Sequence, residues 1–138
     1  MALVNALYDN ARERLAKALL NWPTLNLVMN AWGGDPEASF NPAHLTQSAL
    51  GTPLATSQPI LLPSVAAGGY CRSSYANFAV IPVGGTVQFL TLHEDLATPA
   101  SRPTIAYLAD VAGCPFVPNG LSYLVKPDWL FAQGWFRA

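Results

Sequence analysis

Residues 77–92 read NFAVIPVGGTVQFLTL, two apolar runs on either side of a Gly-Gly pair. Valine, isoleucine and phenylalanine favour strands because their side chains pack well on a pleated surface. Glycine accepts the positive φ that a tight turn requires, so a glycine pair between two such runs is typical of a hairpin. We therefore predict strands over residues 77–83 and 86–92, joined at Gly84 and Gly85.

Further strands are predicted on both sides of this hairpin. Upstream, residues 24–32 alternate leucine or methionine with asparagine or valine. Downstream, apolar runs separated by proline, asparagine and glycine predict strands over residues 104–111, 121–125 and 129–136. Strands at this spacing indicate an antiparallel β-sandwich or a small barrel.

The N-terminal residues carry a different pattern. Over residues 3–20, leucine and alanine recur every three or four positions and charged residues occupy the other side. Pro23 cannot continue a helical hydrogen-bond ladder. We predict an amphipathic helix over residues 3–20 that packs across a β-rich body, in a single domain spanning residues 1–138. The fold class is then α+β, mainly β.

The segment of residues 38–71 contains no Asp, Glu, Lys or Arg and is interrupted by four prolines. It is too apolar for a disordered linker and too broken by proline for regular structure. We expect an extended Pro-rich arm that lies across a surface, either its own or that of a neighbouring subunit. The predicted assembly-interface residues are apolar side chains of this arm and of the C-terminal end: Phe40, Leu54, Ile60, Leu61, Leu62, Trp135 and Phe136.

The composition favours contact with partners. Charged residues make up 11% of the 138 residues and hydrophobic residues 51%, whereas an average soluble domain has about 25% charged residues. Much of the surface is therefore uncharged, which suits burial against other subunits. A compact monomer with a polar, uncharged surface is the alternative reading.

Several partners are not expected. The formal net charge is −1, and there is no basic stripe, since Arg12, Arg14 and Lys17 share one short segment and the other four cations are scattered. We therefore expect no nucleic-acid binding. No apolar run approaches the ~20 residues of a membrane span. The N-terminus lacks the basic and apolar regions of a signal peptide, which predicts synthesis in the cytoplasm. Cys71 and Cys114 are then expected to be reduced and packed, although a disulfide between them is left open.

Few residues of the chain could bind a metal ion or take part in catalysis. No two of the histidines and cysteines have the short spacing of a zinc site, so we expect neither a metal nor a cofactor. His93 is predicted to be solvated in a charged turn beside Glu94 and Asp95, and these carboxylates fit a solvated loop better than an acid–base pair. Cys71 has Arg72 beside it, but no histidine is placed to activate it. We predict that the protein is not an enzyme, and that its tryptophans are core and interface anchors rather than a sugar-binding platform.

Two stretches of the chain resemble a family of small virion-associated proteins of tailed phages. The first runs from Asn5-Ala-Leu-Tyr-Asp-Asn-Ala-Arg12 to Asn21-Trp22, similar to the family's LYD-x-A-R helix that ends before a tryptophan. The second is ATPASRPTIAYLAD at residues 97–110 with GCPFVPNG at residues 113–120, similar to the family's IAYID and GLPVTPNGG segments. FNPAHL at residues 40–45 is a fainter match. The C-terminal part, KPDWLF at residues 126–131, departs from the family's pattern.

The resemblance implies a structural place in a phage particle and brings no catalytic residues with it. We expect a capsid decoration (cement) protein of the virion that contacts the major capsid protein or other virion subunits and associates with itself. A tail, neck or baseplate accessory protein is the second reading. A third, of another class, is a glycan- or receptor-binding module that uses the tryptophans and a loop.

Overall fold

The computed structural model describes most of the chain. The described residues are 6–17, 19, 21–33, 41, 43–61, 63–66, 70–96, 98, 101–108, 116–125 and 136–137. The strands are β1 (Ala6–Leu7), β2 (Leu27–Trp32), β3 (Ala55–Thr56), β4 (Ser64–Ala66), β5 (Tyr70–Arg72), β6 (Ala76–Phe78), β7 (Phe89–Glu94), β8 (Thr104–Leu108), β9 (Tyr123–Val125) and β10 (Phe136–Arg137). The helices are α1 (Asp9–Ala16) and the short 3₁₀ helices η1 (Trp22–Thr24) and η2 (Gln47–Ala49).

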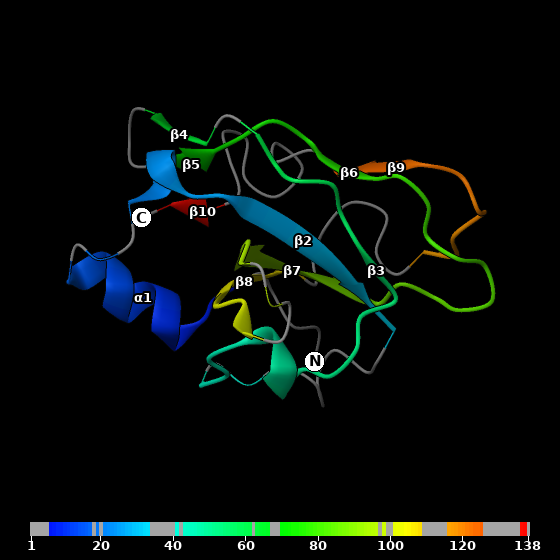
Figure 1. Ribbon diagram of the computed structural model, residues 1–138, viewed down its shortest axis with the longest axis horizontal. Helices are drawn as coiled ribbons and strands as arrows, with labels where there is room; N and C mark the ends of the chain where they lie inside the picture. The colour runs from blue at the N-terminus through cyan, green and yellow to red at the C-terminus, as the bar shows by residue number, and fades with distance from the viewer. Residues whose placement is uncertain are drawn as a thin grey trace.

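A five-stranded antiparallel sheet in the order β1-β8-β7-β2-β3 forms the centre of the molecule (Figure 1). Two smaller antiparallel sheets, β10-β5-β4 and β6-β9, lie toward opposite ends of it. The prediction of a mainly β fold with antiparallel sheets and one α-helix is confirmed. The large sheet ends in two separate edges, β1 and β3, so the described strands form no closed barrel.

The three central strands of the large sheet are buried along their whole length apart from Glu94. Their sequences, LVMNAW, FLTLHE and TIAYL, are correspondingly poor in charge. On one face, Met29, Leu92 and Ala106 form a cross-strand row and pack with Ile60 and Phe78. This apolar face holds the main hydrophobic core, and burying it is the principal driving force for folding.

The predicted hairpin at residues 77–92 is wrong. β6 pairs with β9, and β7 lies between β2 and β8. Pro82 has no N–H for a ladder at this point, and pairing with β2 and β8 leaves β7 almost entirely buried, which suits its apolar sequence. The glycines still turn the chain, because Gly84 has a φ of 106°.

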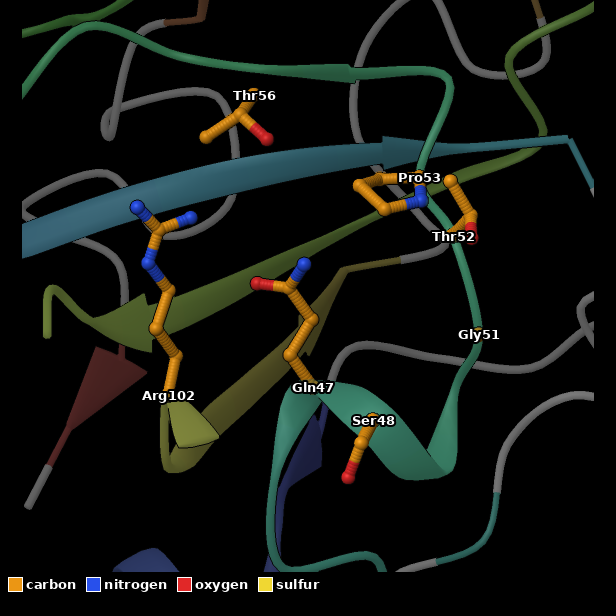
Figure 2. Close-up of a pocket in the computed structure, with 7 residues that line it drawn as sticks. All are labelled: Gln47, Ser48, Gly51, Thr52, Pro53, Thr56 and Arg102. Carbon is orange, nitrogen blue, oxygen red and sulfur yellow. The ribbon is translucent and has the colours of Figure 1, made fainter. Parts of the chain in front are cut away.

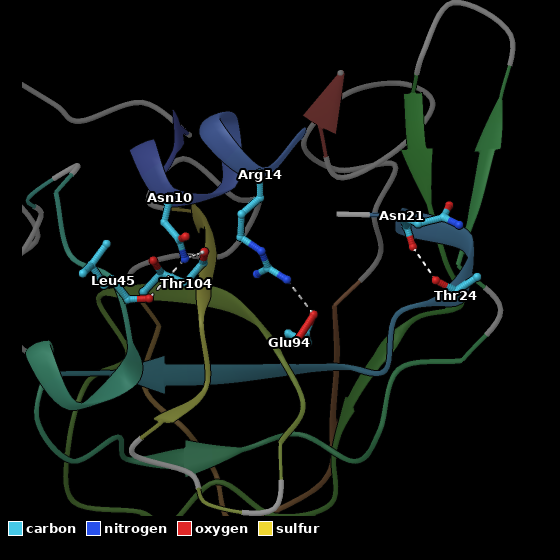
Figure 3. Close-up of polar contacts among 7 residues, drawn as sticks. All are labelled: Asn10, Arg14, Asn21, Thr24, Leu45, Glu94 and Thr104. Carbon is cyan, nitrogen blue, oxygen red and sulfur yellow. Dashed lines mark hydrogen bonds and ion pairs between the residues drawn. The ribbon is translucent and has the colours of Figure 1, made fainter. Parts of the chain in front are cut away.

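The predicted helix over residues 3–20 is shorter in the structure. α1 begins at Asp9, because Ala6 and Leu7 pair instead with Tyr107 and Ala106 as strand β1. The helix ends at Ala16, and Pro23 then lies within the first turn of η1. The packing of this helix against the β-rich body is confirmed by side-chain contacts. Asn10 Nδ2 donates to the carbonyl oxygens of Leu45 (3.2 Å) and Thr104 (3.4 Å) (Figure 3).

Three further predicted strands are confirmed, two with shorter bounds and the one over residues 104–111 as far as the described residue 108. The prediction over residues 24–32 corresponds to β2, that over residues 104–111 to β8, and that over residues 121–125 to β9. Of residues 129–136, only Phe136 lies among the described residues, at the start of β10.

The described part of residues 38–71 runs along the protein's own sheet. Ser57 N donates to Met29 O (2.7 Å), and Ile60 N donates to Leu27 O (2.8 Å). The segment also forms η2, β3 and β4, so the expectation that it holds no regular structure is wrong. Its prolines separate these short elements rather than excluding them. Contact of this segment with neighbouring subunits stays a prediction.

Candidate functional site

A pocket of about 550 Å³ opens between η2 and β3 (Figure 2). Most of its lining residues have polar side chains, but their carbon atoms make up more than half of the exposed lining. The lining residues are Gln47, Ser48, Gly51, Thr52, Pro53, Thr56 and Arg102. In Figure 2, the side chains of Gln47 and Arg102 rise from η2 and from the residues before β8 toward the strand that carries Thr56. We call this the Gln47–Arg102 pocket.

The backbone fixes these two side chains beside each other. Gln47 N donates to Arg102 O (2.9 Å), and Thr46 forms a β-bridge with Pro103. Thr104 N in turn donates to Leu45 O (3.0 Å). The short helix η2 is therefore tied at its start to the residues that lead into β8, and the pocket wall is built from two segments held in register.

Two buried polar atoms of the wall lack a partner. The Oε1 of Gln47, a residue only 5% exposed, and the Nε of Arg102 have no hydrogen-bond partner among the described residues. The other end of Arg102 is engaged, since its Nη2 lies 3.0 Å from Asp95 Oδ1. An unpaired buried polar group costs about 1–3 kcal/mol, and both of these atoms are covered by the protein itself.

A polar row crosses the sheet face beside the pocket. Thr56, Asn30 and Thr91 are direct cross-strand neighbours on β3, β2 and β7. Thr56 Oγ1 donates to Asn30 Oδ1 (2.8 Å), and Trp32 Nε1 donates to Thr91 Oγ1 (2.6 Å). Asn30 is fully buried, and its Nδ2 finds no partner within the described part of the chain. This face of the sheet is therefore polar and aromatic where the opposite face is aliphatic.

His93 is fully buried in β7, so the prediction of a solvated histidine in a turn is wrong. Its Nε2 lies 2.6 Å from Thr91 Oγ1. Burial, assisted by the charge of Arg102, lowers the pKa of His93 to about 4. The ring is therefore neutral at neutral pH.

The two carboxylates beside His93 are held in ion pairs. Glu94 Oε1 lies 2.9 Å from Arg14 Nη2 (Figure 3). Asp95 pairs with Arg102. They do not form an acid–base pair with each other. Across the described ranges, no three histidine, cysteine, aspartate or glutamate side chains are grouped to hold a metal ion.

Cys71 is a free, buried thiol in β5. Burial raises the pKa of the thiol to about 11, so the neighbouring Arg72 does not activate it. The expectation that Cys71 is a packed residue is confirmed. Cys114 lies outside the described residues.

The tryptophans within the described residues belong to the interior. Trp22 and Trp32 are buried, and the Trp32 ring stacks on Phe89 with a centroid distance of 6.1 Å. They confirm the predicted core role, while Trp129 and Trp135 lie outside the described residues. A second pocket of about 380 Å³ lies above this ring pair and shares Thr52 with the Gln47–Arg102 pocket.

The predicted interface residues that the structure describes differ in burial. Ile60 was expected at an interface, but its side chain is 3% exposed and lies in the core, so this prediction is wrong. Leu54 and Leu61 are exposed on the surface. Phe136 lies in β10, opposite Cys71. Three further residues lie outside the described part of the chain: Phe40, Leu62 and Trp135.

A patch of exposed apolar side chains around the β6-β9 sheet was not predicted from the sequence. We call it the β6-β9 patch. Its members are between 46% and 73% exposed: Val80, Val83, Val117, Leu121 and Leu124. Four of the five residues lie in the strands predicted over residues 77–83 and 121–125, where apolar side chains are ordinary, so the sequence does not distinguish them from core residues.

No helix in the described residues is long and apolar enough to cross a membrane. Comparison of the chain with protein-family models, curated proteins and solved structures finds no match.

Proposed function

We propose that this chain is a structural subunit of a tailed-phage virion, acting as a capsid decoration (cement) protein. The observation that carries the proposal is the β6-β9 patch. Large apolar side chains that remain in water favour association, because each Å² removed from water contributes about 25 cal/mol. A decoration protein repeats this contact many times over a lattice, so modest individual contacts give a durable shell.

The shape of the patch supports the same proposal. Phe78 and Tyr123 are cross-strand neighbours, and the Tyr123 ring stacks on Phe116 with centroids 4.3 Å apart. Beside this pair lies a shallow pocket of about 190 Å³ lined by Ile81, Val117 and Leu121 among others. An apolar recess with exposed apolar side chains around it suits the insertion of a partner's side chain, the arrangement found at the centre of protein interfaces.

The proposal retains the finer expectations about the fold. Packing of sheet against sheet would make the β-rich body a sandwich. Residues 38–71 would contact adjacent subunits through the exposed Leu54 and Leu61. The partners would be the major capsid protein and further copies of this chain, after synthesis in the cytoplasm of the host bacterium.

The test is quantitative mass spectrometry of purified virions, with the major capsid protein as the reference. A copy number of the same order as the capsid protein supports the decoration role. A far lower copy number assigns the chain instead to the tail, neck or baseplate, the alternative location. Absence from purified virions contradicts the proposal altogether.

A further inference from the structure

Strand β9 has one side that no described strand pairs with. Among the described strands, β6 and β9 pair only with each other, in a two-stranded antiparallel sheet at the rim of the molecule (Figure 1). On the far side of β6, Gln58 N donates to Asn77 O (2.8 Å). The outer side of β6 is therefore occupied by the protein's own chain, whereas no described segment pairs with the outer side of β9.

The hydrogen-bond pattern of this sheet points the backbone of Leu124 outward. In an antiparallel ladder, opposite residues alternate between pairs that exchange both hydrogen bonds and pairs whose N–H and C=O groups point away from each other. Because Asn77 O accepts from Gln58, its pair with Leu124 is of the second kind. The N–H and C=O of Leu124 therefore point away from β6, and neither has a hydrogen-bond partner among the described residues.

The side chains at this edge are apolar and lack the usual protection of an edge strand. Leu124 is 46% exposed, and Leu121, just before β9, is 67% exposed. Both belong to the β6-β9 patch. Proteins commonly guard an exposed edge with a charged residue, a proline or a bulge. The three residues of β9, Tyr-Leu-Val, include no charge and no proline, and their register with β6 is regular.

The absence of charge favours a second copy of the chain as the partner. When a surface meets its own copy about a two-fold axis, a residue near the axis faces itself, so a charged residue there would face a like charge. Residues 73–93 and 116–125, which include the β6-β9 sheet and its patch, contain no Asp, Glu, Lys or Arg. This surface can therefore face its own copy without charge repulsion, and it offers no charge that would select a different partner.

From these observations we propose that β9 pairs antiparallel with β9 of a second copy, about a two-fold axis at Leu124. The N–H of each Leu124 donates to the C=O of the other, which joins the two sheets into one continuous sheet in the order β6-β9-β9-β6. The two Leu124 side chains then lie side by side on one face and shield each other from water. The inference rests on the proposed function for its place in the particle, where such pairs would link neighbouring subunits through the β6-β9 patch.

Sedimentation equilibrium of the purified full chain, from micromolar to millimolar concentration, tests the inference. We expect a monomer–dimer equilibrium. Leu124→Lys places two ammonium groups at the axis and removes the apolar contact, so it should raise the dissociation constant of the dimer about tenfold or more. The matched control is Asn77→Lys, because Asn77 is the exposed cross-strand neighbour of Leu124 but lies on β6, whose outer side Gln58 occupies. The dissociation constant of this control should equal that of the unmodified protein.

Amide hydrogen exchange of the unmodified protein provides a second measurement that needs no variant to fold. Exchange of the Leu124 N–H should slow as the protein concentration rises, because pairing between copies protects it. The N–H of Tyr123 belongs to the ladder with Phe78 within one copy. Its exchange should change far less with concentration.

Four results would overturn the inference. The first is a monomer at every concentration, and the second is a dimer in which exchange at Leu124 does not depend on concentration. The third is a dimer that Leu124→Lys leaves intact, and the fourth is equal weakening by Leu124→Lys and Asn77→Lys. None of these bears on the proposed function as long as the protein is found in purified virions. A dimer of a protein that is absent from virions would instead contradict the proposed function alone.

Discussion

At the scale of single residues, buried polar groups distinguish the two faces of the large sheet. Trp32, Thr91 and His93 form a chain of hydrogen bonds on one face, with both links 2.6 Å long. Because hydrogen bonding offsets the cost of burying polar groups, these residues occupy positions where an apolar side chain would otherwise be expected. A change in the protonation of His93 therefore acts on the interior of the sheet.

Acid is expected to destabilise the protein through His93. The pKa of His93 is about 4 in the folded protein, against an ordinary value of 6.5. As the pH falls below 6.5, the unfolded chain binds this proton first, so the free energy of unfolding decreases until about pH 4. The total loss from this residue is about 3 kcal/mol.

Urea unfolding at a series of pH values between neutral and pH 4 measures this effect. The control is His93→Gln, which keeps a polar side chain but cannot titrate. Its free energy of unfolding should fall less over the same range. Parallel pH profiles for the two proteins would show that the acid sensitivity comes from other groups.

At the scale of elements, α1 is joined to the sheet by one partly buried ion pair. Arg14 Nη2 lies 2.9 Å from Glu94 Oε1, and both side chains are mostly covered. The pair links the helix to the end of β7 across 80 residues of sequence. A contact of this kind stabilises the docked helix, whereas a pair within the helix stabilises only the helix itself.

A double-mutant cycle of Arg14→Met and Glu94→Gln should give a coupling energy of about 1 kcal/mol. The matched comparison is Lys17 and Glu13, an exposed pair formed by the C-cap residue and a residue of the same helix. Chemical denaturation of the single and double variants provides the measurement. We expect the smaller coupling in the exposed pair, and the reverse order would contradict the proposed anchoring of α1.

The turn at Gly84 provides a second test at this scale. Gly84 has a φ of 106°, and a Cβ added there meets no atom within 4 Å. Gly84→Ala should therefore cost about 1–2 kcal/mol through backbone strain alone. The neighbouring Gly85→Ala is the control, because its added Cβ makes only ordinary contacts, 3.8 Å from Leu54 Cδ1 at the closest. Equal stabilities of the two variants in thermal unfolding would rule out strain at Gly84.

At the scale of the whole molecule, the exposed apolar surface decides how the chain associates. Val117 and Leu121 are the two most exposed members of the β6-β9 patch. The double variant Val117→Ser, Leu121→Ser should leave monomer stability within about 0.5 kcal/mol, as is usual for surface sites. Incorporation into virions should fall sharply, as measured by mass spectrometry of purified particles.

Leu19→Ser is the control for this experiment, because Leu19 has the same exposed fraction as Leu121, 67%, and lies outside the patch. It should be incorporated normally. Loss of incorporation in the Leu19 variant as well would point to a general effect of reduced surface hydrophobicity. Normal incorporation of the patch variant would exclude this surface as the site of attachment.

The sequence by itself determined which kinds of element the chain forms. Local structure is specified by the helical periodicity near the N-terminus and by the apolar runs that form β2, β8 and β9. This is because side-chain spacing and backbone preference act within a few residues. The mainly β class follows from these local preferences. The burial of Cys71 could also be predicted, because an isolated cysteine without an activating group is usually a packing residue.

Only the tertiary structure decided which strands pair and what lies inside. β7 pairs with β2 and β8 rather than with β6, and this buries His93, a residue whose neighbours in sequence suggested a solvated turn. The pocket likewise depends on Gln47 and Arg102, which are distant in sequence and meet through one backbone hydrogen bond. The physical reason is that strand partners are chosen by the total apolar area buried, a property of the folded chain that no short segment contains.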